Sequence, residues 1–341
     1  MNKKRPGVIV WYCTTSCDYQ CRHCWRFESR HARELDTDEA KILIKRVAEI
    51  SPRLLVFSGG EPLLRKDILE LFEFAREQGL NIATDIRTAP CDKEVAQALA
   101  GNQVHACITV DAISPGITDN ICGFKGAHER LMQTIKLCEQ YGVEFGFNTA
   151  VQQLNADEVT AIARWAEEIG ATTHHISMLI PLGKAAPSYT SMCLDSPHFI
   201  KCLNDIYQEE QRQGSCNIVV YEPTYLPYVK EANGVLPNWG RVCKIGEYLH
   251  IDVNGHVLPC TRATSTVGSI LEKPLLEIYE EMVSSPFFSA LRNHKNLKEP
   301  CASCQYGDIC GGCRIRAHAL TGDWFAADPV CPYKERERGI S

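Results

Sequence analysis

The chain has 341 residues, which at about 150 residues per domain predicts roughly two domains. Its 45% apolar and 23% charged residues are typical of a globular protein, and its net charge of −6 argues against a nucleic-acid binder that works through bulk positive charge. No apolar run approaches the roughly 18 residues that a membrane span needs, and the first residues lack a signal-peptide pattern. We therefore expect a soluble, cytoplasmic protein with no nucleic-acid or membrane partner.

From residue 8 to about 180, short β-branched apolar runs alternate with amphipathic helical patterns. The pattern at 67–78 has the 3.6-residue period, with Ile68, Leu71, Phe72 and Ala75 on one face. Six such units predict parallel strands with helices packed outside them, an α/β fold. Because this is two units short of a closed eight-stranded barrel, we expect a partial (β/α)6 TIM-like barrel. Strands are predicted at 8–12, 54–57, 81–84, 106–110, 144–151 and 174–179, and helices at 38–50, 67–78, 93–100, 127–141, 156–169 and 197–212.

The alternation stops after Gln213. Val253-Asn254-Gly255 lies between two apolar runs and predicts a hairpin turn, and the rest of the chain is short, loop-like and rich in cysteine. The sequence therefore predicts a barrel domain over residues 1–215, a linker over 216–240 and a small Cys-rich domain over 241–341.

Ten of the 18 cysteines gather in two groups, which in a cytosolic protein indicates metal or redox chemistry rather than disulfides. Cys17, Cys21 and Cys24 follow the first strand with C-x3-C-x2-C spacing. Three thiolates on one loop can hold three irons of a four-iron cluster and leave the fourth iron open. A zinc knuckle with His23 as fourth ligand, or a set of buried free thiols, fits the spacing equally well.

The second predicted strand ends in Ser58-Gly59-Gly60-Glu61-Pro62. Its glycines let a ligand approach the backbone closely, and Glu61 offers a carboxylate to an amino group. Together with the cysteine loop, this segment resembles the radical S-adenosylmethionine (SAM) superfamily, over residues 8 to about 184. The resemblance implies that Cys17, Cys21 and Cys24 hold a catalytic 4Fe–4S cluster that binds SAM and, once reduced, cleaves it to a 5′-deoxyadenosyl radical.

The same resemblance implies a set of SAM contacts. His23 would lie near the adenine, the segment 59–62 would receive the methionine amino group, and residues at the ends of the fourth and fifth strands would line the ribose and methionine side. From the residues alone, the latter could equally be strand-end hydrogen bonders or a helix cap. The cofactor-binding residues implied are His23, Gly59, Gly60, Glu61, Pro62, Thr109, Asp111 and Asn148.

Two positions depart from the family pattern. The third strand is followed by Thr84-Asp85-Ile86 where the family often has Thr-Asn-Gly, so a contact from Asp85 is uncertain. Cys122 stands where relatives usually place an arginine for the SAM carboxylate. Lys125 could supply that charge, although less rigidly than a guanidinium.

Seven cysteines near the end of the chain form the second group. Paired C-x2-C also occurs in zinc ribbons, but seven thiols fit two iron–sulfur clusters better. The order resembles the SPASM extension of radical SAM enzymes, which implies one auxiliary 4Fe–4S cluster on Cys301, Cys304, Cys310 and Cys331 and a second on Cys243, Cys260 and Cys313. The fourth ligand of the second cluster is either a distant thiol such as Cys216 or absent, leaving an open iron.

The segment 310–331 resembles the C-termini of the haem-biosynthetic branch of this superfamily, whose members remodel acetate or propionate side chains of a tetrapyrrole. Arg314, Arg316, His318 and Arg262 could pair with such carboxylates, or form a basic face that caps the auxiliary cluster. We therefore predict an enzyme that decarboxylates or deacetylates a tetrapyrrole side chain and receives electrons from a ferredoxin- or flavodoxin-like partner.

Two other functions stay open. Many SPASM enzymes modify ribosomally made peptides, commonly through an N-terminal recognition domain. Only seven residues precede the first predicted strand here, which favours a small substrate, although sulfatase-maturase-like enzymes lack that domain as well. The other alternative, a non-catalytic iron–sulfur electron carrier, is disfavoured by Gly59-Gly60-Glu61-Pro62, because a carrier needs no SAM pocket.

Overall fold

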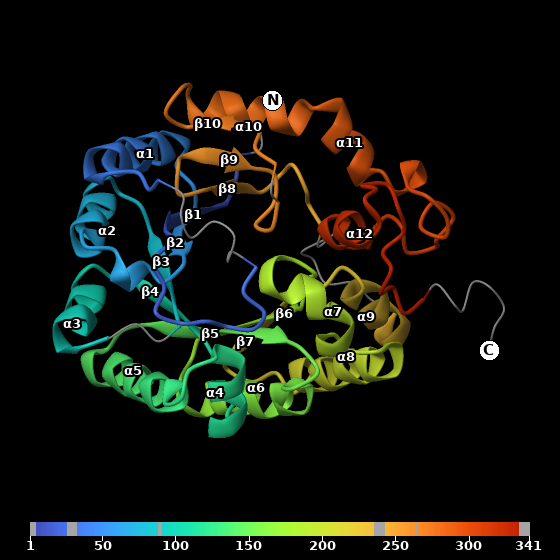
Figure 1. The fold of residues 1–341 in the computed structure, drawn as a ribbon, viewed down its shortest axis with the longest axis horizontal. Helices are drawn as coiled ribbons and strands as arrows, with labels where there is room; N and C mark the ends of the chain where they lie inside the picture. Colours follow the sequence, from blue (N-terminus) through green and yellow to red (C-terminus); the bar gives the residue numbers. More distant parts are fainter. Residues whose placement is uncertain (1–4, 26–32, 88–90, 235–242, 264, 334–341) are drawn as a thin grey trace.

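In the computed structural model, which describes residues 5–25, 33–87, 91–234, 243–263 and 265–333, the β-strands form one curved sheet. The strand order is β10-β9-β8-β1-β2-β3-β4-β5-β6-β7, and every neighbouring pair from β1 to β7 is parallel. Helices cover the outer side of the curve (Figure 1). The parallel strands are β1 (Val8–Thr14), β2 (Leu54–Gly59), β3 (Ile82–Ile86), β4 (His105–Thr109), β5 (Phe145–Val151), β6 (Thr173–Met178) and β7 (Asn217–Val220).

The helices confirm the predicted alternation of strand and helix. The first of them begins at a capping box, in which the Asp36 carboxylate accepts from the Glu39 N–H and the Glu39 carboxylate accepts from the Asp36 N–H. The helices that accompany the parallel strands are α1 (Thr37–Ile50), α2 (Ile68–Glu77), α3 (Lys93–Gly101), α4 (Pro115–Cys122), α5 (Ala127–Tyr141), α6 (Val159–Glu168), α7 (Tyr189–Met192), α8 (Ser196–Glu210) and α9 (Tyr225–Asn233).

The main core lies between the sheet and these helices. The predicted apolar face of α2, which comprises Ile68, Leu71, Phe72 and Ala75, is buried. The ring of Phe72 meets Phe57 of β2 at 5.0 Å between centroids, and Phe57 meets Trp11 of β1 at 5.5 Å. Alternate strand residues therefore pack outward against helices, which leaves the other residues of each strand to line the inside of the curve.

The sheet extends beyond the six predicted units. The segment 216–240, expected to be a linker, contains β7 and α9, and β7 pairs with β6. β7 has only four residues, three of them at least partly exposed, so its sequence shows no strong strand pattern. The division of the chain into domains stays a prediction.

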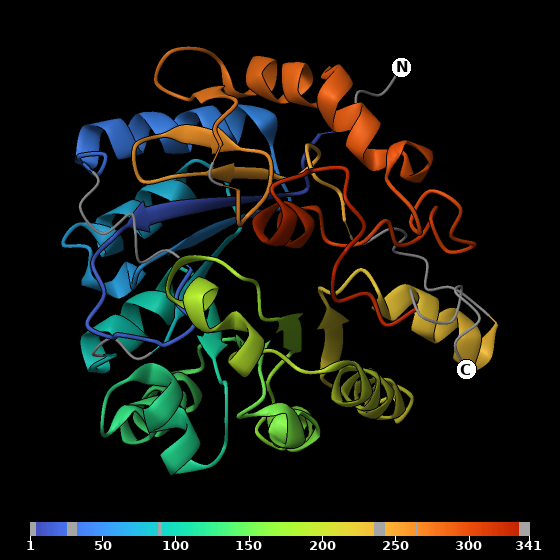
Figure 2. The same ribbon diagram turned by 45° about the vertical axis from the view of Figure 1, so that its right-hand side comes forward.

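The C-terminal region joins the same sheet at its other end. The predicted hairpin is confirmed: β8 (Leu249–Ile251) pairs antiparallel with β9 (His256–Leu258). β8 also runs parallel to β1, with Val10 opposite His250, so residues some 240 positions apart in the chain become neighbours. The remaining elements are β10 (Gly268–Ser269), α10 (Leu275–Ser284), α11 (Pro286–Arg292) and α12 (Arg314–Thr321). Helix α10 lies beside α1 on the outer side of the sheet, and α12 lies at the open side of the barrel (Figure 1 and Figure 2).

A buried ionic cluster ties α12 to the far edge of the sheet. The Arg316 guanidinium donates to both carboxylate oxygens of Glu222, at 3.0 Å each, and to Asp328 at 2.6 and 2.8 Å. All three side chains are at most 2% exposed. Arg314 is equally buried and donates to the carbonyls of Trp324 and Ala326. Arg316 is therefore neutralised within the fold, which contradicts the prediction that it meets a substrate carboxylate. Arg314 Nε and Nη2 are buried and have no hydrogen-bond partner among the described residues, so the prediction for Arg314 stays a prediction.

His318, the third basic residue predicted on this helix, stacks on the ring of Trp324 with 4.1 Å between ring centroids. Among the described residues, no helix is both long and apolar enough to cross a membrane.

We predict that Arg316→Met destabilises the protein by about 3–5 kcal/mol, because it leaves the buried Glu222 and Asp328 carboxylates together without a cation. Lys298→Ala is the matched control. It breaks an exposed pair with Asp323 and should leave the unfolding midpoint nearly unchanged. Urea unfolding of the cluster-loaded protein measures both, and equal midpoints for the two variants would contradict the assignment.

Candidate functional site

The first cysteine loop follows β1 at the carboxyl end of the sheet. The N–H groups of Gln20 and Arg22 donate to the carbonyls of Cys122 and Ile121, at 3.3 and 3.0 Å, which fixes the loop to the end of α4. On the other side, the Lys184 N–H donates to the Cys24 carbonyl at 3.0 Å. Backbone contacts therefore shape the loop before any cofactor binds.

Cys17, Cys21 and Cys24 share one apolar cluster with Tyr19 and Cys122. A hydrogen bond from the Cys122 thiol, helped by the nearby positive charge of Arg87, lowers the pKa of Cys21 to about 5 despite its burial. Burial raises the pKa of Cys17 to about 11. The three sulfurs therefore lie on one short loop in different electrostatic surroundings, and one of them favours the thiolate that an iron ligand must be.

Gly59 and Gly60 make room for the chain that follows β1. Gly60 N–H donates to the Thr14 carbonyl at 2.8 Å, and Glu61 N–H donates to the Ser16 carbonyl at 2.7 Å. A Cβ at Gly59 would lie 2.3 Å from the Thr14 oxygen, and a Cβ at Gly60 would lie 2.2 Å from the Ser16 oxygen. Only glycines allow this approach, which places the Gly59–Pro62 segment directly beside the start of the cysteine loop.

The Glu61 side chain has a role that the sequence did not indicate. It is 1% exposed, accepts the N–H of Arg87 at 2.8 Å, and caps the short helix η2 (Pro62–Leu64) at Leu63. Glu61 thus connects the end of β2 to the end of β3.

Arg87 is the residue that brings the predicted SAM contacts together, and sequence reasoning missed it. Its guanidinium donates to the Asp111 carboxylate at 2.7 Å and to the Cys122 sulfur at 3.4 Å, and lies 3.5 Å from His23 Nε2. Asp111 in turn accepts the N–H of Ala150 at 2.9 Å. The sequence signal that could have identified Arg87 is its position directly after β3, at the carboxyl edge of the parallel sheet, where active sites lie in such folds.

The charged groups around Arg87 shift one another's pKa values. Burial opposes ionisation of Asp111, but the charges of Arg87 and His23 and hydrogen bonds from Ala150 and Arg87 outweigh it and hold the Asp111 pKa below its ordinary value. Burial lowers the pKa of His23, whose Nδ1 lies 3.3 Å from the Gln152 amide nitrogen. The site therefore presents the His23 imidazole beside an Arg87–Asp111 ion pair.

Another cation lies close to position 122, where relatives usually have an arginine. Arg87, which directly follows β3, donates to the Cys122 sulfur. A guanidinium therefore lies beside the position on α4 where relatives usually have an arginine. Lys125 is exposed and lies outside this group of contacts. Arg87, rather than Lys125, is the described cation that contacts Cys122.

Asp85 joins two further predicted residues on the inner side of the barrel. It accepts from the Ser58 hydroxyl and from the Asn148 amide, the latter at 3.3 Å. Asn148 lies opposite Thr109 in the β4–β5 register. Burial, only partly offset by these two hydrogen bonds, raises the pKa of Asp85 to about 6.

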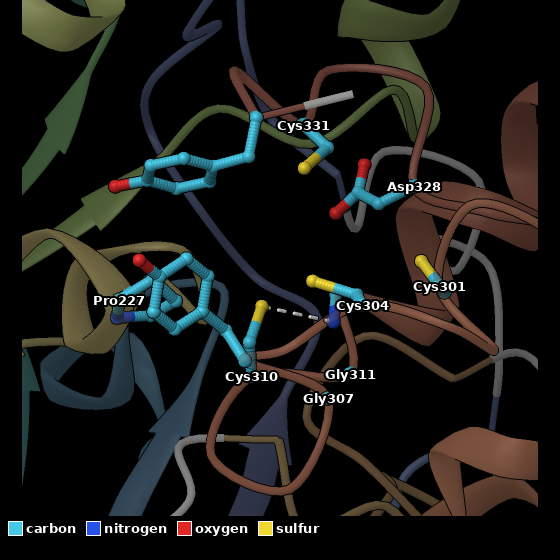
Figure 3. A pocket seen from close by; sticks show the side chains of 11 residues that line it. Pro227, Cys301, Cys304, Gly307, Cys310, Gly311, Asp328 and Cys331 are labelled. Atoms are coloured by element: carbon cyan, nitrogen blue, oxygen red, sulfur yellow. Dashed lines mark hydrogen bonds between the residues drawn. The ribbon is translucent and has the colours of Figure 1, made fainter. Parts of the chain in front are cut away.

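Four of the C-terminal cysteines line one pocket. Cys301, Cys304, Cys310 and Cys331 gather there with Pro227 of α9 and Asp328 (Figure 3). The Cys310 sulfur accepts the Gly312 N–H at 3.3 Å. This is the set of four that the SPASM resemblance grouped together.

The remaining three auxiliary cysteines are not among the residues that line this pocket. Cys243 is close enough for its charge to raise the pKa of both Cys260 and Cys313, to about 11 and about 12, although burial is the larger cause for each. The suggested fourth ligand, Cys216, is buried at the start of β7, and the charge that acts on it is that of Glu167 on α6. The structure therefore brings Cys243, Cys260 and Cys313 together and places Cys216 elsewhere.

These arrangements fit iron–sulfur clusters. Among the described residues, no three His, Cys, Asp or Glu side chains converge as ligands of one metal ion. A 4Fe–4S cluster does not require such convergence, because each cysteine binds a different iron. His23, the suggested fourth zinc ligand, has its nitrogens beside Gln152 and Arg87.

We predict a pH dependence of stability from Asp85. Its pKa of about 6 in the folded state exceeds the ordinary value of 3.8, so the folded protein holds a proton that the unfolded chain releases. Stability should therefore fall as pH rises through this window and level off above pH 6. Between pH 5 and pH 7 the wild type should lose about 1 kcal/mol relative to Asp85→Asn.

Urea midpoints of both proteins at pH 5, 6 and 7 measure this difference, because other titrating groups cancel between them. Parallel pH profiles would contradict the raised pKa.

Comparison with known proteins gives two matched regions. Residues 11–166 match the Radical SAM superfamily, and residues 243–305 match SPASM, an iron–sulfur cluster-binding domain. The first region contains the three N-terminal cysteines and the Gly59–Pro62 segment. The second contains Cys243, Cys260, Cys301 and Cys304.

Relatives match the chain almost from end to end. An AdoMet-dependent heme synthase of Methanosarcina barkeri is 29% identical over 96% of this chain and 97% of its own length. A protein of the same name from Nitratidesulfovibrio vulgaris is 30% identical over 96% and 93%. A PqqA peptide cyclase of Bradyrhizobium diazoefficiens is 28% identical over 96% of this chain and 86% of its own length.

Solved structures share the fold. Streptococcus suis SuiB bound to S-adenosylmethionine superimposes with a TM-score of 0.73 at 17% identity, over 96% of this chain and 77% of that one. The anSMEcpe protein with bound AdoMet and a peptide gives 0.72 at 18% identity, over 96% and 94%. The haem-branch resemblance of the sequence agrees with the heme synthase relatives, while both substrate classes occur among the proteins it matches. The chain belongs to the radical SAM superfamily: it is an enzyme with a SPASM domain that uses a 4Fe–4S cluster and SAM.

Proposed function

We propose that this enzyme modifies a carboxylate-bearing side chain of a tetrapyrrole, by decarboxylation or deacetylation. The observation that carries the proposal is the match to the heme synthase of M. barkeri, which spans 96% of this chain and 97% of that protein. A relative named Fe-coproporphyrin III synthase, 26% identical over 99% of this chain, supports the same substrate class.

In this proposal Cys17, Cys21 and Cys24 hold the 4Fe–4S cluster that binds SAM. When bound and reduced, this pair supplies a 5′-deoxyadenosyl radical that abstracts a substrate hydrogen. The chain fits such a group through three sulfurs on a loop that is fixed by backbone hydrogen bonds, with the Gly59–Pro62 segment directly beside it.

The surrounding residues orient the cofactor. The methionine amino group would lie beside the segment Gly59, Gly60, Glu61 and Pro62. Arg87 holds Asp111 and His23 in place and offers the guanidinium for the SAM carboxylate. Asn148 and Thr109, at the ends of neighbouring strands, line the ribose side.

The second cysteine group would hold two auxiliary clusters, one on Cys301, Cys304, Cys310 and Cys331 and one on Cys243, Cys260 and Cys313. Cys216 lies beside Glu167, so the latter cluster would have three cysteine ligands and would leave one iron open. Electrons would come from a ferredoxin- or flavodoxin-like donor in the cytoplasm, where thiols stay reduced.

Peptide modification is the second candidate. The PqqA peptide cyclase of B. diazoefficiens is 28% identical over 96% of this chain, close to the value for the heme synthases, although the match covers 86% of that protein. A peptide substrate would bring its own carboxylates or hydrophobic side chains to the same barrel opening.

We predict that the triple variant Cys17→Ala, Cys21→Ala, Cys24→Ala loses about four irons per chain and all SAM cleavage. The C-terminal iron should remain, since the second cysteine group is unchanged. Anaerobic iron analysis and 5′-deoxyadenosine assays measure the two effects. The triple variant Cys138→Ala, Cys193→Ala, Cys202→Ala is the control, and retained cleavage in the first variant would reject the cluster assignment.

The substrate class is tested with the anaerobically reconstituted wild type, SAM, dithionite and iron coproporphyrin III. We expect 5′-deoxyadenosine together with a porphyrin of lower mass, because decarboxylation shortens a propionate side chain. Mass spectrometry detects both products. An unchanged porphyrin alongside 5′-deoxyadenosine would reject the tetrapyrrole proposal and favour a peptide.

A further inference from the structure

Arg262 stands on a loop that is fixed between the two cysteine groups. The loop follows β9 and contains Cys260. The Tyr12 hydroxyl of β1 donates to the Thr261 carbonyl at 2.7 Å, and the Thr261 hydroxyl lies 3.1 Å from His250 Nε2 of β8. Arg262 is therefore attached to a segment that two barrel strands hold in place.

The same contacts lead back to the first cysteine loop. Trp25 follows Cys24 directly, and its ring packs edge-on against Tyr12 with 5.5 Å between centroids. Arg262 is close enough to His23 for its charge to help lower the pKa of that imidazole, although burial is the larger cause. Its charge also acts on Cys260. The Arg262 side chain thus lies between the predicted SAM site and the Cys243, Cys260 and Cys313 group.

Among the described residues the Arg262 guanidinium has no carboxylate partner, unlike those of Arg87 and Arg316. Arg87 pairs with Asp111, and Arg316 pairs with Glu222 and Asp328. In the part of the chain that the structure describes, Arg262 is partly buried, and its guanidinium has no carboxylate partner and no hydrogen bond. A cation withdrawn from water without a counter-ion costs free energy, so this position favours an anionic ligand.

We propose that Arg262 binds a carboxylate of the substrate and thereby orients the reacting side chain between the two cysteine groups. This inference rests on the proposed function, from which it takes the substrate class. A guanidinium can hold a carboxylate through two parallel hydrogen bonds, which fixes direction as well as distance. Of the four basic residues that the sequence suggested for substrate carboxylates, Arg316 is paired with carboxylates, Arg314 is buried and donates to two carbonyls, and His318 stacks on Trp324. Arg262 is the partly exposed arginine of this set.

The test is a binding titration with the cluster-loaded protein and SAM, without reductant, followed through the absorption of the porphyrin. The probe is iron coproporphyrin III, and its tetramethyl ester removes the negative charges while keeping the ring. Arg262→Gln should weaken binding of the acid by about tenfold or more, and Arg262→Lys by less, because lysine keeps the charge but not the bidentate geometry. The ester should bind the wild type and Arg262→Gln equally weakly.

Two controls separate binding from structure. Arg53→Gln removes an exposed arginine that directly precedes β2 and is distant from Arg262 in the sequence. It should leave porphyrin affinity unchanged. Cleavage of SAM by Arg262→Gln with dithionite and no porphyrin should stay within about twofold of the wild type, because SAM binding rests on other residues.

The outcomes are distinct. Weaker binding in Arg262→Gln with intact SAM cleavage supports the proposal. Wild-type affinity in Arg262→Gln overturns the assignment of Arg262 while leaving the tetrapyrrole function intact, if the wild type still converts the porphyrin. Failure of the wild type itself to bind the acid overturns both.

Discussion

The close backbone contact between Gly59–Gly60 and the chain after β1 is the constraint on which the site depends. Two hydrogen bonds, from Gly60 to Thr14 and from Glu61 to Ser16, bring the end of β2 against the start of the cysteine loop. No residue with a Cβ fits at either glycine, since the atom would lie within 2.3 Å of a carbonyl oxygen. From this contact the cysteine loop continues to the end of α4, and Glu61 reaches the end of β3.

Buried charge organises both halves of the molecule in the same way. Arg87 and Asp111 pair where the strands end, and Arg316 joins Glu222 to Asp328 where the C-terminal segment meets β7 and α9. Each buried guanidinium is satisfied by carboxylates, so removal of either partner would leave an expensive charge. Arg262 is different, because its position between the two cysteine groups leaves its charge to an external anion.

The fold brings the two cysteine groups into one region because the C-terminal part of the chain returns to the barrel. β8 pairs with β1, and Arg316 reaches Glu222 beyond β7, so the segment that contains α12 lies at the side where the sheet is open (Figure 1). The first strand thus contacts β2 on one side and the C-terminal hairpin on the other. A substrate held at the barrel opening would lie close to both cysteine groups.

The sequence by itself determined the alternation of strands and helices, the two cysteine groups and the Gly59–Pro62 segment. These features are local: apolar periodicity sets the elements, and the spacing of thiols sets the loops. It did not reveal β7, a short, partly exposed strand whose pairing comes from its neighbour. The sequence also did not distinguish the roles of the arginines, because nothing local to Arg316 or Arg262 shows which of them is ion-paired. Only the tertiary structure decided that Arg316 is neutralised by carboxylates more than ten residues away and that Arg87 lies beside Cys122. It also decided that Arg262 has no such partner within the described parts of the chain. Ion pairing depends on which distant side chains the fold brings within a few ångströms, and no local pattern encodes that distance.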